Sequence, residues 1–345
     1  MCNIAGYIGT KAAAPILTGM MLRQEGYNGG FYTGIATVHG GKLLFAKRTG
    51  NTQHLLDTTN AANLPGNIGI MHSRTNDGGG DVWAHPFIGY RGEEPALAYL
   101  GNGMMGHFAP RVPEFIPLVQ ELLDQGYKMA LLEQTGNKPY LQLSDGTHAH
   151  MSDAMCQLIL RYMDSGLKIA DAMEAAFCRM PAEVVALTLS PDTPACVAWA
   201  RFNMPVYVAF ASHGAYLAST PAAFPDDITT EPQLLPPCSS GYVYADHFTV
   251  RPMKAPPAQI APMDPRVRQQ VYALVCRQLS EESVMYAQLV KMARALFPGW
   301  DMNPANALVY DAMYDLLKQG RLKKQPRQVP AAREDLCAYK YYFSL

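Results

Sequence analysis

Apolar residues recur with two different periods along the chain, and the period changes several times. Near the start, Asn3–Ile8 alternates and ends at Gly9, which is typical of a short strand. The following segment, Ala12–Arg23, is rich in Ala, Leu and Met and carries Pro15 in its first turn. This composition predicts a helix, because Pro is well tolerated at the start of one.

Segments of both kinds continue to about residue 218. Short strands are expected at Gly34–Val38, Lys42–Ala46, Asn67–His72 and Ala96–Leu100. Helices are expected at Phe115–Leu123, from a Ser152 cap to Met163, and at Ile169–Phe177. Strands are expected again at Val184–Leu189, Ala195–Ala200, Val206–Phe210 and Ala215–Ala218. This order of strands, helices and strands predicts an α+β layered fold rather than a doubly wound one.

A proline-rich segment divides the chain. Residues 251–262 contain four prolines and predict a linker between a domain at 2–250 and a small helical domain at 263–345. The expected helix starts in the second domain are Asp264-Pro265, Ser280 and Asn303-Pro304. The last helix is expected to end at Gly320, and Tyr339–Phe343 has the character of a strand. Three helices and a basic hairpin loosely resemble a winged-helix layout.

The overall charge is balanced and favours neither nucleic acid nor an acidic membrane surface. The 345 residues include 28 Lys+Arg and 29 Asp+Glu, which gives a formal net charge of -1. No apolar run of about eighteen residues is present, and the start lacks a basic stretch followed by an apolar one. We therefore expect a cytoplasmic protein without membrane contact. A solvated face explains the basic run better than nucleic-acid contact; it comprises Lys318, Arg321, Lys323, Lys324 and Arg327.

Seven dispersed cysteines, with no Cys-x-x-Cys pair, indicate free thiols in a reducing compartment. Cys2 differs from the others because removal of Met1 would leave it with a free α-amino group. Such a group titrates at about 7.7–8.0, so it can take the thiol proton and later protonate a leaving amine. Cys2 is therefore a candidate nucleophile that carries its own base. The alternative is an incidental cysteine at position two.

Several segments resemble class II glutamine amidotransferases, especially the glutaminase half of glucosamine-6-phosphate synthase. The resemblance begins with Met1–Gly9 and weakens towards Pro221. Its remaining segments are Tyr27–Val38, Gly69–Phe87 with His72-Ser73-Arg74 and Ala84-His85-Pro86-Phe87, and Tyr99–Met104 with Gly101-Asn102-Gly103. No single motif is decisive, but their order and spacing are specific, and together they cover roughly the first two thirds of the chain.

The resemblance implies a four-layer α/β/β/α sandwich of the N-terminal-nucleophile hydrolases over residues 2 to about 250. It also implies hydrolysis of glutamine through a thioester on Cys2, with release of ammonia. In the family, the Asn-Gly pair that matches Asn102 and Gly103 forms the oxyanion hole, which donates hydrogen bonds to the tetrahedral intermediate. The alternative for this pair is an ordinary Asn-Gly turn after a strand.

The resemblance also implies residues that hold the substrate. Arg74 matches the arginine that binds the α-carboxylate, a task that suits a bidentate guanidinium. Asp153 is the better match for the aspartate that binds the ammonium group, and Asp145 is its rival. For either Asp, the alternative is helix capping or a turn. The matching segments further place Thr75, Asp77 and His85 around the substrate.

The sequence also departs from the family at several positions near these motifs. Asn3, Asn28 and Phe31 replace the family's usual Gly, Arg and acidic residue. After Arg74, the family's Trp, Thr and His are replaced by Thr75, Asp77 and Gly78. An Asp at that place repels a substrate carboxylate unless it is paired. Two alternatives therefore stay open: an amidohydrolase that cleaves a different amide, and a catalytically silent sensor whose C-terminal domain binds DNA or protein.

No cofactor or metal is expected. Residues 101–106 match the dinucleotide fingerprint, but the chain then reaches Pro110 and Pro113 instead of opening a helix. His148 and His150 alternate as metal ligands sometimes do, yet no third ligand is near, and surface histidines are the commoner explanation. The C-terminal segment is too short for a sugar-phosphate isomerase domain. We therefore expect any ammonia acceptor to be a separate synthase.

Overall fold

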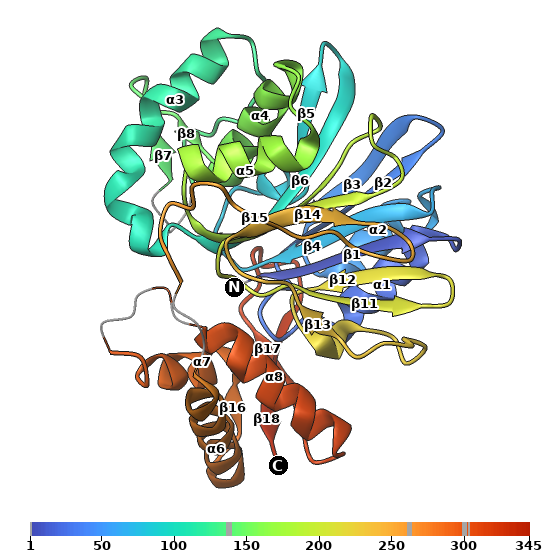
Figure 1. Ribbon diagram of the computed structural model, residues 1–345, viewed down its shortest axis with the longest axis vertical. Helices are drawn as coiled ribbons and strands as arrows, with labels where there is room; N and C mark the ends of the chain where they lie inside the picture. The colour runs from blue at the N-terminus through green and yellow to red at the C-terminus, as the bar shows by residue number, and fades with distance from the viewer. Residues whose placement is uncertain (1, 136–139, 261–263, 299–301, 303) are drawn as a thin grey trace.

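The first two thirds of the chain form two stacked antiparallel sheets between two helical layers (Figure 1). The computed structural model describes residues 2–135, 140–260, 264–298, 302 and 304–345. Helices α1 (Ala13–Gln24) and α2 (Thr52–Thr58) cover the outer face of the first sheet. Helices α3 (Val112–Asp124), α4 (Met151–Asp164) and α5 (Ile169–Arg179) cover the outer face of the second. The expected α+β layering is confirmed.

The first sheet combines strands from the beginning and the end of this region, whereas the strands of the second come from its middle and end. The first sheet has the order β13 (Gln233–Leu234), β11 (Tyr207–Ala211), β12 (Gly214–Ala218), β1 (Asn3–Gly9), β4 (Ile68–Arg74), β2 (Tyr32–His39) and β3 (Lys42–Thr49). The second sheet has the order β15 (Arg251–Pro252), β14 (Ser239–Val243), β10 (Val197–Arg201), β9 (Glu183–Leu189), β6 (Glu94–Met104) and β5 (Phe87–Arg91). β1 is therefore central in the first sheet, and β10 and β9 are central in the second, where β6 lies between β9 and the edge strand β5.

The burial of β1 shows why the two sheets stack. Ile4 and Ile8 face the core between the sheets, whereas Ala5 and Tyr7 face the core under α1 and α2. Since successive strand residues point to opposite faces, β1 is buried on both sides. A small hairpin, β7 (Leu141–Gln142) and β8 (His148–Ala149), precedes α4. Short 3₁₀ helices occupy four connections: η1 (Ala61–Asn63), η2 (Asp81–Trp83), η3 (Gly106–Arg111) and η4 (Pro221–Ala223).

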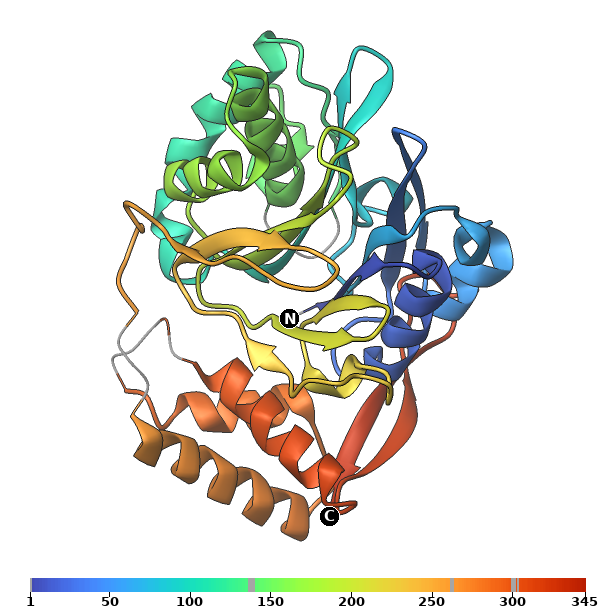
Figure 2. The same ribbon diagram turned by 45° about the vertical axis from the view of Figure 1, so that its right-hand side comes forward.

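The C-terminal segment packs against the edge of the sheets at which β1 begins (Figures 1 and 2). Its helices are α6 (Pro265–Glu281), α7 (Tyr286–Arg294) and α8 (Ala305–Lys318). Its three-stranded sheet has the order β16 (Val284–Met285), β18 (Ala338–Ser344) and β17 (Lys323–Val329). Tyr27 from the N-terminal part is buried in the core of this segment, so the contact is a packed one.

Asp264 caps the first of these helices as predicted, but several other boundaries were predicted wrongly. The Asp264 carboxylate accepts a hydrogen bond from the Arg266 amide at 2.9 Å. Ser280 does not start a helix, because α6 continues through it to Glu281. The cap of α4 is His150, whose ring accepts a hydrogen bond from the Ser152 amide, so Ser152 lies inside the helix.

The linker and the C-terminal domain also differ in part from the expectation. Residues 251–252 form β15, because they pair with β14 at the edge of the second sheet. Asn303 lies outside the described residues, and α8 begins at Ala305. The division into two domains stays a prediction. Within the described ranges, no helix has both the length and the apolar character that crossing a membrane requires.

Candidate active site

Cys2 directly precedes β1 and lines a cavity together with residues of the C-terminal helices α7 and α8. The residue is 8% exposed, and its Sγ lies 3.9 Å from Thr75 Oγ1. The next residue, Asn3, pairs with Ser73 on β4. The last residues of β4 and the first residues of β1 therefore lie side by side. This pairing brings Thr75 to the thiol.

Asn102 from the second sheet forms two reciprocal hydrogen bonds with Cys2. The Cys2 backbone nitrogen donates to Asn102 Oδ1 at 2.7 Å, and Asn102 Nδ2 donates to the Cys2 carbonyl at 2.8 Å. Asn102 is fully buried, so both bonds are shielded from water. They fix the orientation of the Cys2 backbone nitrogen. An amide nitrogen has two N–H donors, and one of those of Asn102 is used by the Cys2 carbonyl.

Gly103 occupies a position that no larger residue fits. A Cβ atom there would lie 2.0 Å from the Glu183 carbonyl of β9. Gly103 lines the same cavity as Cys2, one residue after Asn102. Asn102 and Gly103 therefore lie at the end of a strand, beside the thiol, rather than in a hairpin turn.

A cavity of about 320 Å³ opens beside Cys2. Asn28, Thr75, Asp77 and Gly103 contribute to its lining from the N-terminal part. The C-terminal helices contribute a further part of the lining, which comprises Tyr286, Ala287, Val290, Lys291, Arg294 and Asn306. Cys2 therefore faces a cavity that two regions of the chain build together.

Thr75 and Asp77 both line this cavity and are hydrogen-bonded to each other. The Thr75 hydroxyl donates a hydrogen bond to the Asp77 carboxylate. The Asp77 carbonyl accepts a further bond from the Tyr140 hydroxyl at 2.7 Å. The negative charge of Asp77 lies in the cavity wall, as do the positive charges of Lys291 and Arg294 on α7.

Arg74 is buried, and its guanidinium is engaged by the protein itself. It donates hydrogen bonds to the carbonyls of Gly78 and Trp83 and lies 4.4 Å from the centroid of the Tyr32 ring. Arg74 does not belong to the described lining of the Cys2 cavity. The observed contacts make Arg74 the anchor of the loop that carries Thr75 and Asp77.

Arg74→Lys is therefore expected to destabilise the fold. An ammonium cannot reach both carbonyls in the geometry of a guanidinium fork, and a lost hydrogen bond to a charged group costs about 1.5–3 kcal/mol. Urea denaturation should show this loss, with Arg277→Lys on an exposed part of α6 as the matched control. Unchanged stability together with a raised KM for glutamine would instead support the carboxylate-binding role.

His85 belongs to a buried cluster of aromatic rings. Its centroid lies 4.0 Å from that of His72 and 5.7 Å from that of His150. Burial lowers the pKa of His85 well below its ordinary value, and the neighbouring charges act in the same direction. Among the residues of the Cys2 cavity that the structure describes, His85 is absent. His150 is buried as well, so the expectation of a surface histidine was wrong.

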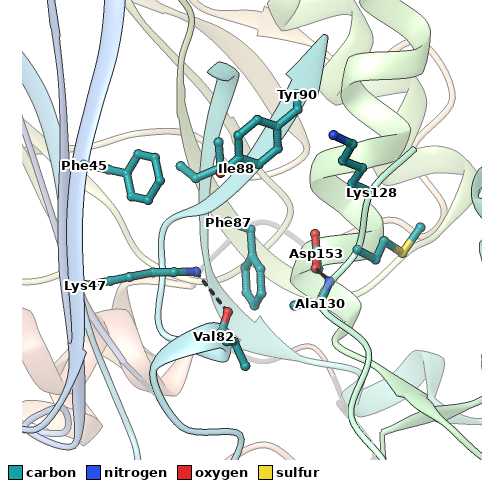
Figure 3. A pocket seen from close by; sticks show the side chains of 10 residues that line it. Phe45, Lys47, Val82, Phe87, Ile88, Tyr90, Lys128, Ala130 and Asp153 are labelled. Carbon is teal, nitrogen blue, oxygen red and sulfur yellow. Dashed lines mark hydrogen bonds between the residues drawn. The ribbon is translucent and has the colours of Figure 1, made fainter. Parts of the chain in front are cut away.

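Asp153 lines a second pocket, shown in Figure 3, and not the described wall of the Cys2 cavity. Its carboxylate accepts hydrogen bonds from the Ala130 amide at 2.8 Å and from Gln157 Nε2 at 2.9 Å. Burial is the main cause that raises its pKa to about 6. Its rival, Asp145, is exposed and accepts bonds from Thr147 in the turn between β7 and β8. Neither carboxylate meets Cys2 in the described cavity.

Lys340 on β18 reaches the loop beside Cys2 from the other end of the chain. Its Nζ donates hydrogen bonds to the carbonyls of Asn28 and Gly29, the second at 2.7 Å, and lies 4.7 Å from the Phe31 ring centroid. Burial lowers its pKa to about 8, while electrostatic interactions with Cys2, Glu25 and Asp77 act in the opposite direction. Asn28 lines the cavity, so the hydrogen bond from Lys340 stabilises the backbone of a cavity-lining residue.

Lys340→Met is expected to lower kcat about ten- to a hundred-fold, because small displacements of reacting groups have effects of that size. The exposed Lys323→Met on β17 is the matched control. Lys340 loses its charge as pH rises through about 8. Lys340→Arg should therefore restore activity and move the alkaline limb of the pH profile upward, because a guanidinium stays protonated. An unchanged kcat and pH profile in the Met variant would refute this role.

Sequence patterns gave no indication of the residues that the C-terminal segment contributes to the site. Lys291, Arg294 and Lys340 carry no motif, and their roles depend on a contact between segments far apart in sequence. The only available signal was the pair of departures at Asn28 and Phe31, both of which lie beside Lys340. The basic run extends from the end of α8 into β17, and its five residues are exposed, as predicted for a solvated face.

Comparisons with known proteins place the similarity in the N-terminal part of larger enzymes. No protein-family model matches the chain. It is 28% identical over 257 residues to the glutamine–fructose-6-phosphate aminotransferase of Pyrococcus horikoshii, covering 73% of this chain and 38% of that protein. It is 29% identical over 228 residues to the Leifsonia xyli protein of the same name, covering 65% and 32%. The chain thus spans about a third of the length of these relatives.

Solved structures agree with this similarity at the level of the fold. A glutamine phosphoribosylpyrophosphate amidotransferase from B. subtilis aligns with a TM-score of 0.57 at 15% identity, covering 85% of this chain and 64% of that one. An allosteric regulatory enzyme of purine biosynthesis aligns with a TM-score of 0.56 at 15% identity, covering 90% and 63%. The similarity of this chain to the class II glutamine amidotransferases, which are enzymes, is thereby confirmed.

Proposed function

We propose that this chain hydrolyses the side-chain amide of glutamine through a thioester on Cys2. The observation that carries the proposal is the reciprocal hydrogen bonding of Cys2 and Asn102 beside a cavity lined by the Cys2 thiol and Gly103. It supports the proposal because the nucleophile, its base and two oxyanion donors then meet at one point.

The reaction follows from these positions. The α-amino group takes the thiol proton, and Sγ attacks the amide carbon to give a tetrahedral oxyanion. The oxyanion accepts hydrogen bonds from the Gly103 amide and the second N–H of Asn102. The C–N bond then breaks, ammonia leaves with the proton from the α-amino group, and water hydrolyses the thioester. We further propose that a separate synthase consumes the ammonia.

Met1 is expected to be absent from the active protein. The Cys2 backbone nitrogen donates a hydrogen bond to Asn102 Oδ1. While Met1 is attached, this nitrogen belongs to a peptide bond, and an amide nitrogen cannot serve as a base. Intact-mass measurement of protein purified from cells should give the mass of residues 2–345. Active protein that retains Met1 would exclude the α-amino group as the base.

A different amide substrate is the second candidate, and the surroundings of Cys2 favour it specifically. Arg74 already binds two backbone carbonyls, while Asp77 and the α7 cations Lys291 and Arg294 line the cavity. An amide with an anionic group that reaches α7 fits these charges without using Arg74. Such a substrate would still be cleaved by the same steps at Cys2.

Ammonia release from a panel of amides tests the two candidates. The panel contains glutamine, its carboxyl-amidated analogue, N-acetylglutamine and asparagine, each with wild type and with Cys2→Ala. Glutamine as the best substrate supports the first candidate, and faster cleavage of an analogue supports the second. Release from none of the amides by protein that lacks Met1 would contradict the glutaminase proposal and favour the catalytically silent sensor.

A further inference from the structure

A second pocket lies between β3, β5 and the start of α4, away from Cys2 (Figure 3). Its volume is about 210 Å³, roughly seven times the share of one water molecule in the liquid. Its described lining has no residue in common with that of the Cys2 cavity. The pocket is therefore a separate place at which a small molecule can bind.

Two opposite charges line this pocket without bonding to each other. Figure 3 shows Lys47 and Asp153 on opposite sides of Phe87. Within the described part of the chain, Lys47 Nζ forms one hydrogen bond, to the Val82 carbonyl at 2.9 Å. An ammonium has three donors, so two remain for a ligand. No ion pair between Lys47 and Asp153 is present among the described residues.

The Asp153 carboxylate also keeps capacity for a ligand. Each of its oxygens accepts one hydrogen bond, from Ala130 or from Gln157, and each can accept another. The carboxylate is buried, and burial raises its pKa to about 6, so it is mainly charged at neutral pH. Lys128, the other cation of the pocket, is already paired with Glu93 at 2.7 Å.

Apolar side chains line the pocket between Lys47 and Asp153. Phe87 and Ile88 are buried, while Phe45, Tyr90 and Met129 are half-buried. A pure anion in the pocket would meet Asp153, and a pure cation would meet Lys47. A neutral apolar molecule would leave both charges desolvated without a partner. A small zwitterion with an apolar side chain complements Lys47, Asp153 and the apolar side chains between them.

We propose that this pocket binds a free α-amino acid with an apolar side chain. Its carboxylate receives hydrogen bonds from Lys47, its ammonium group donates to Asp153, and its side chain packs among Phe45, Ile88 and Tyr90. The site is independent of the hydrolysis proposed at Cys2, because an apolar amino acid has no side-chain amide to cleave.

Isothermal titration calorimetry with leucine at pH 7 tests the proposal. We expect saturable binding of one leucine per chain. Leucinamide, which lacks the carboxylate, and 4-methylpentanoate, which lacks the amine, should each bind at least about tenfold more weakly. Lys47→Met and Asp153→Asn should each weaken leucine by a similar factor. Asp145→Asn, at an exposed Asp of the same domain, is the matched control.

The ligand series on wild type decides the matter even if a variant fails to fold. No heat with leucine, or equal binding of leucine and both analogues, would overturn the proposal. So would leucine binding that is unchanged in either folded pocket variant. Cys2→Ser should bind leucine as wild type does, and loss of binding in that variant would place leucine in the Cys2 cavity and overturn the proposal.

Discussion

Cys2→Ala is expected to lower kcat for amide hydrolysis on the order of 10⁴- to 10⁶-fold, the scale for loss of a covalent nucleophile. The variant keeps the α-amino group and its hydrogen bond to Asn102, because both belong to the backbone of residue 2. The base and the oxyanion donors therefore remain, and only the attacking sulfur is removed. Single-turnover release of ammonia measures the loss.

Cys337→Ala provides the matched control, since this cysteine is free and exposed. It should keep the wild-type rate, and thermal unfolding of both variants should resemble that of wild type. Residual activity of Cys2→Ala within tenfold of wild type would mean that another group performs the attack.

Asn102→Ala should have the second-largest effect. Loss of one oxyanion donor lowers kcat about a hundred- to a thousand-fold. The substitution also removes both hydrogen bonds that hold the Cys2 backbone, so the orientation of the base is lost together with the donor. KM should change much less than kcat, because the oxyanion forms only near the transition state.

The kinetic comparison needs a variant that alters an Asn away from the site. Asn60→Ala, on the exposed surface before η1, serves this purpose. If Asn102→Ala instead raises KM while kcat is unchanged, Asn102 contributes to ground-state binding and the oxyanion assignment is wrong.

Cys2 and the Asn102-Gly103 pair were predictable as candidate site residues because each belongs to a short sequence motif. Cys2 opens a strand, and the Asn102-Gly103 pair ends another, so short motifs identify them. Their proximity in space could be predicted only from the family resemblance, because neither segment by itself indicates that the two sheets stack at this point. The alternation of β1 predicted a strand, but not that both of its faces are buried.

The rest of the site could not be predicted because it depends on long-range packing. The expected carboxylate ligand Arg74 is bound by two carbonyls of its own loop, which only the folded loop reveals. Asp153 has the expected place at the start of α4, yet the helix presents it to a second pocket. Lys340 reaches Asn28 from 312 residues away, and no local pattern encodes such a contact.

Detection of an acyl group on Cys2 tests the central claim most directly. Protein is mixed with glutamine, quenched in acid during turnover and digested, and the N-terminal peptide is weighed by mass spectrometry. We predict a glutamyl adduct on the peptide that begins with Cys2, with no adduct in Cys2→Ala. Turnover without any adduct on that peptide, or an adduct on a different residue, would contradict the assignment of Cys2 as the nucleophile.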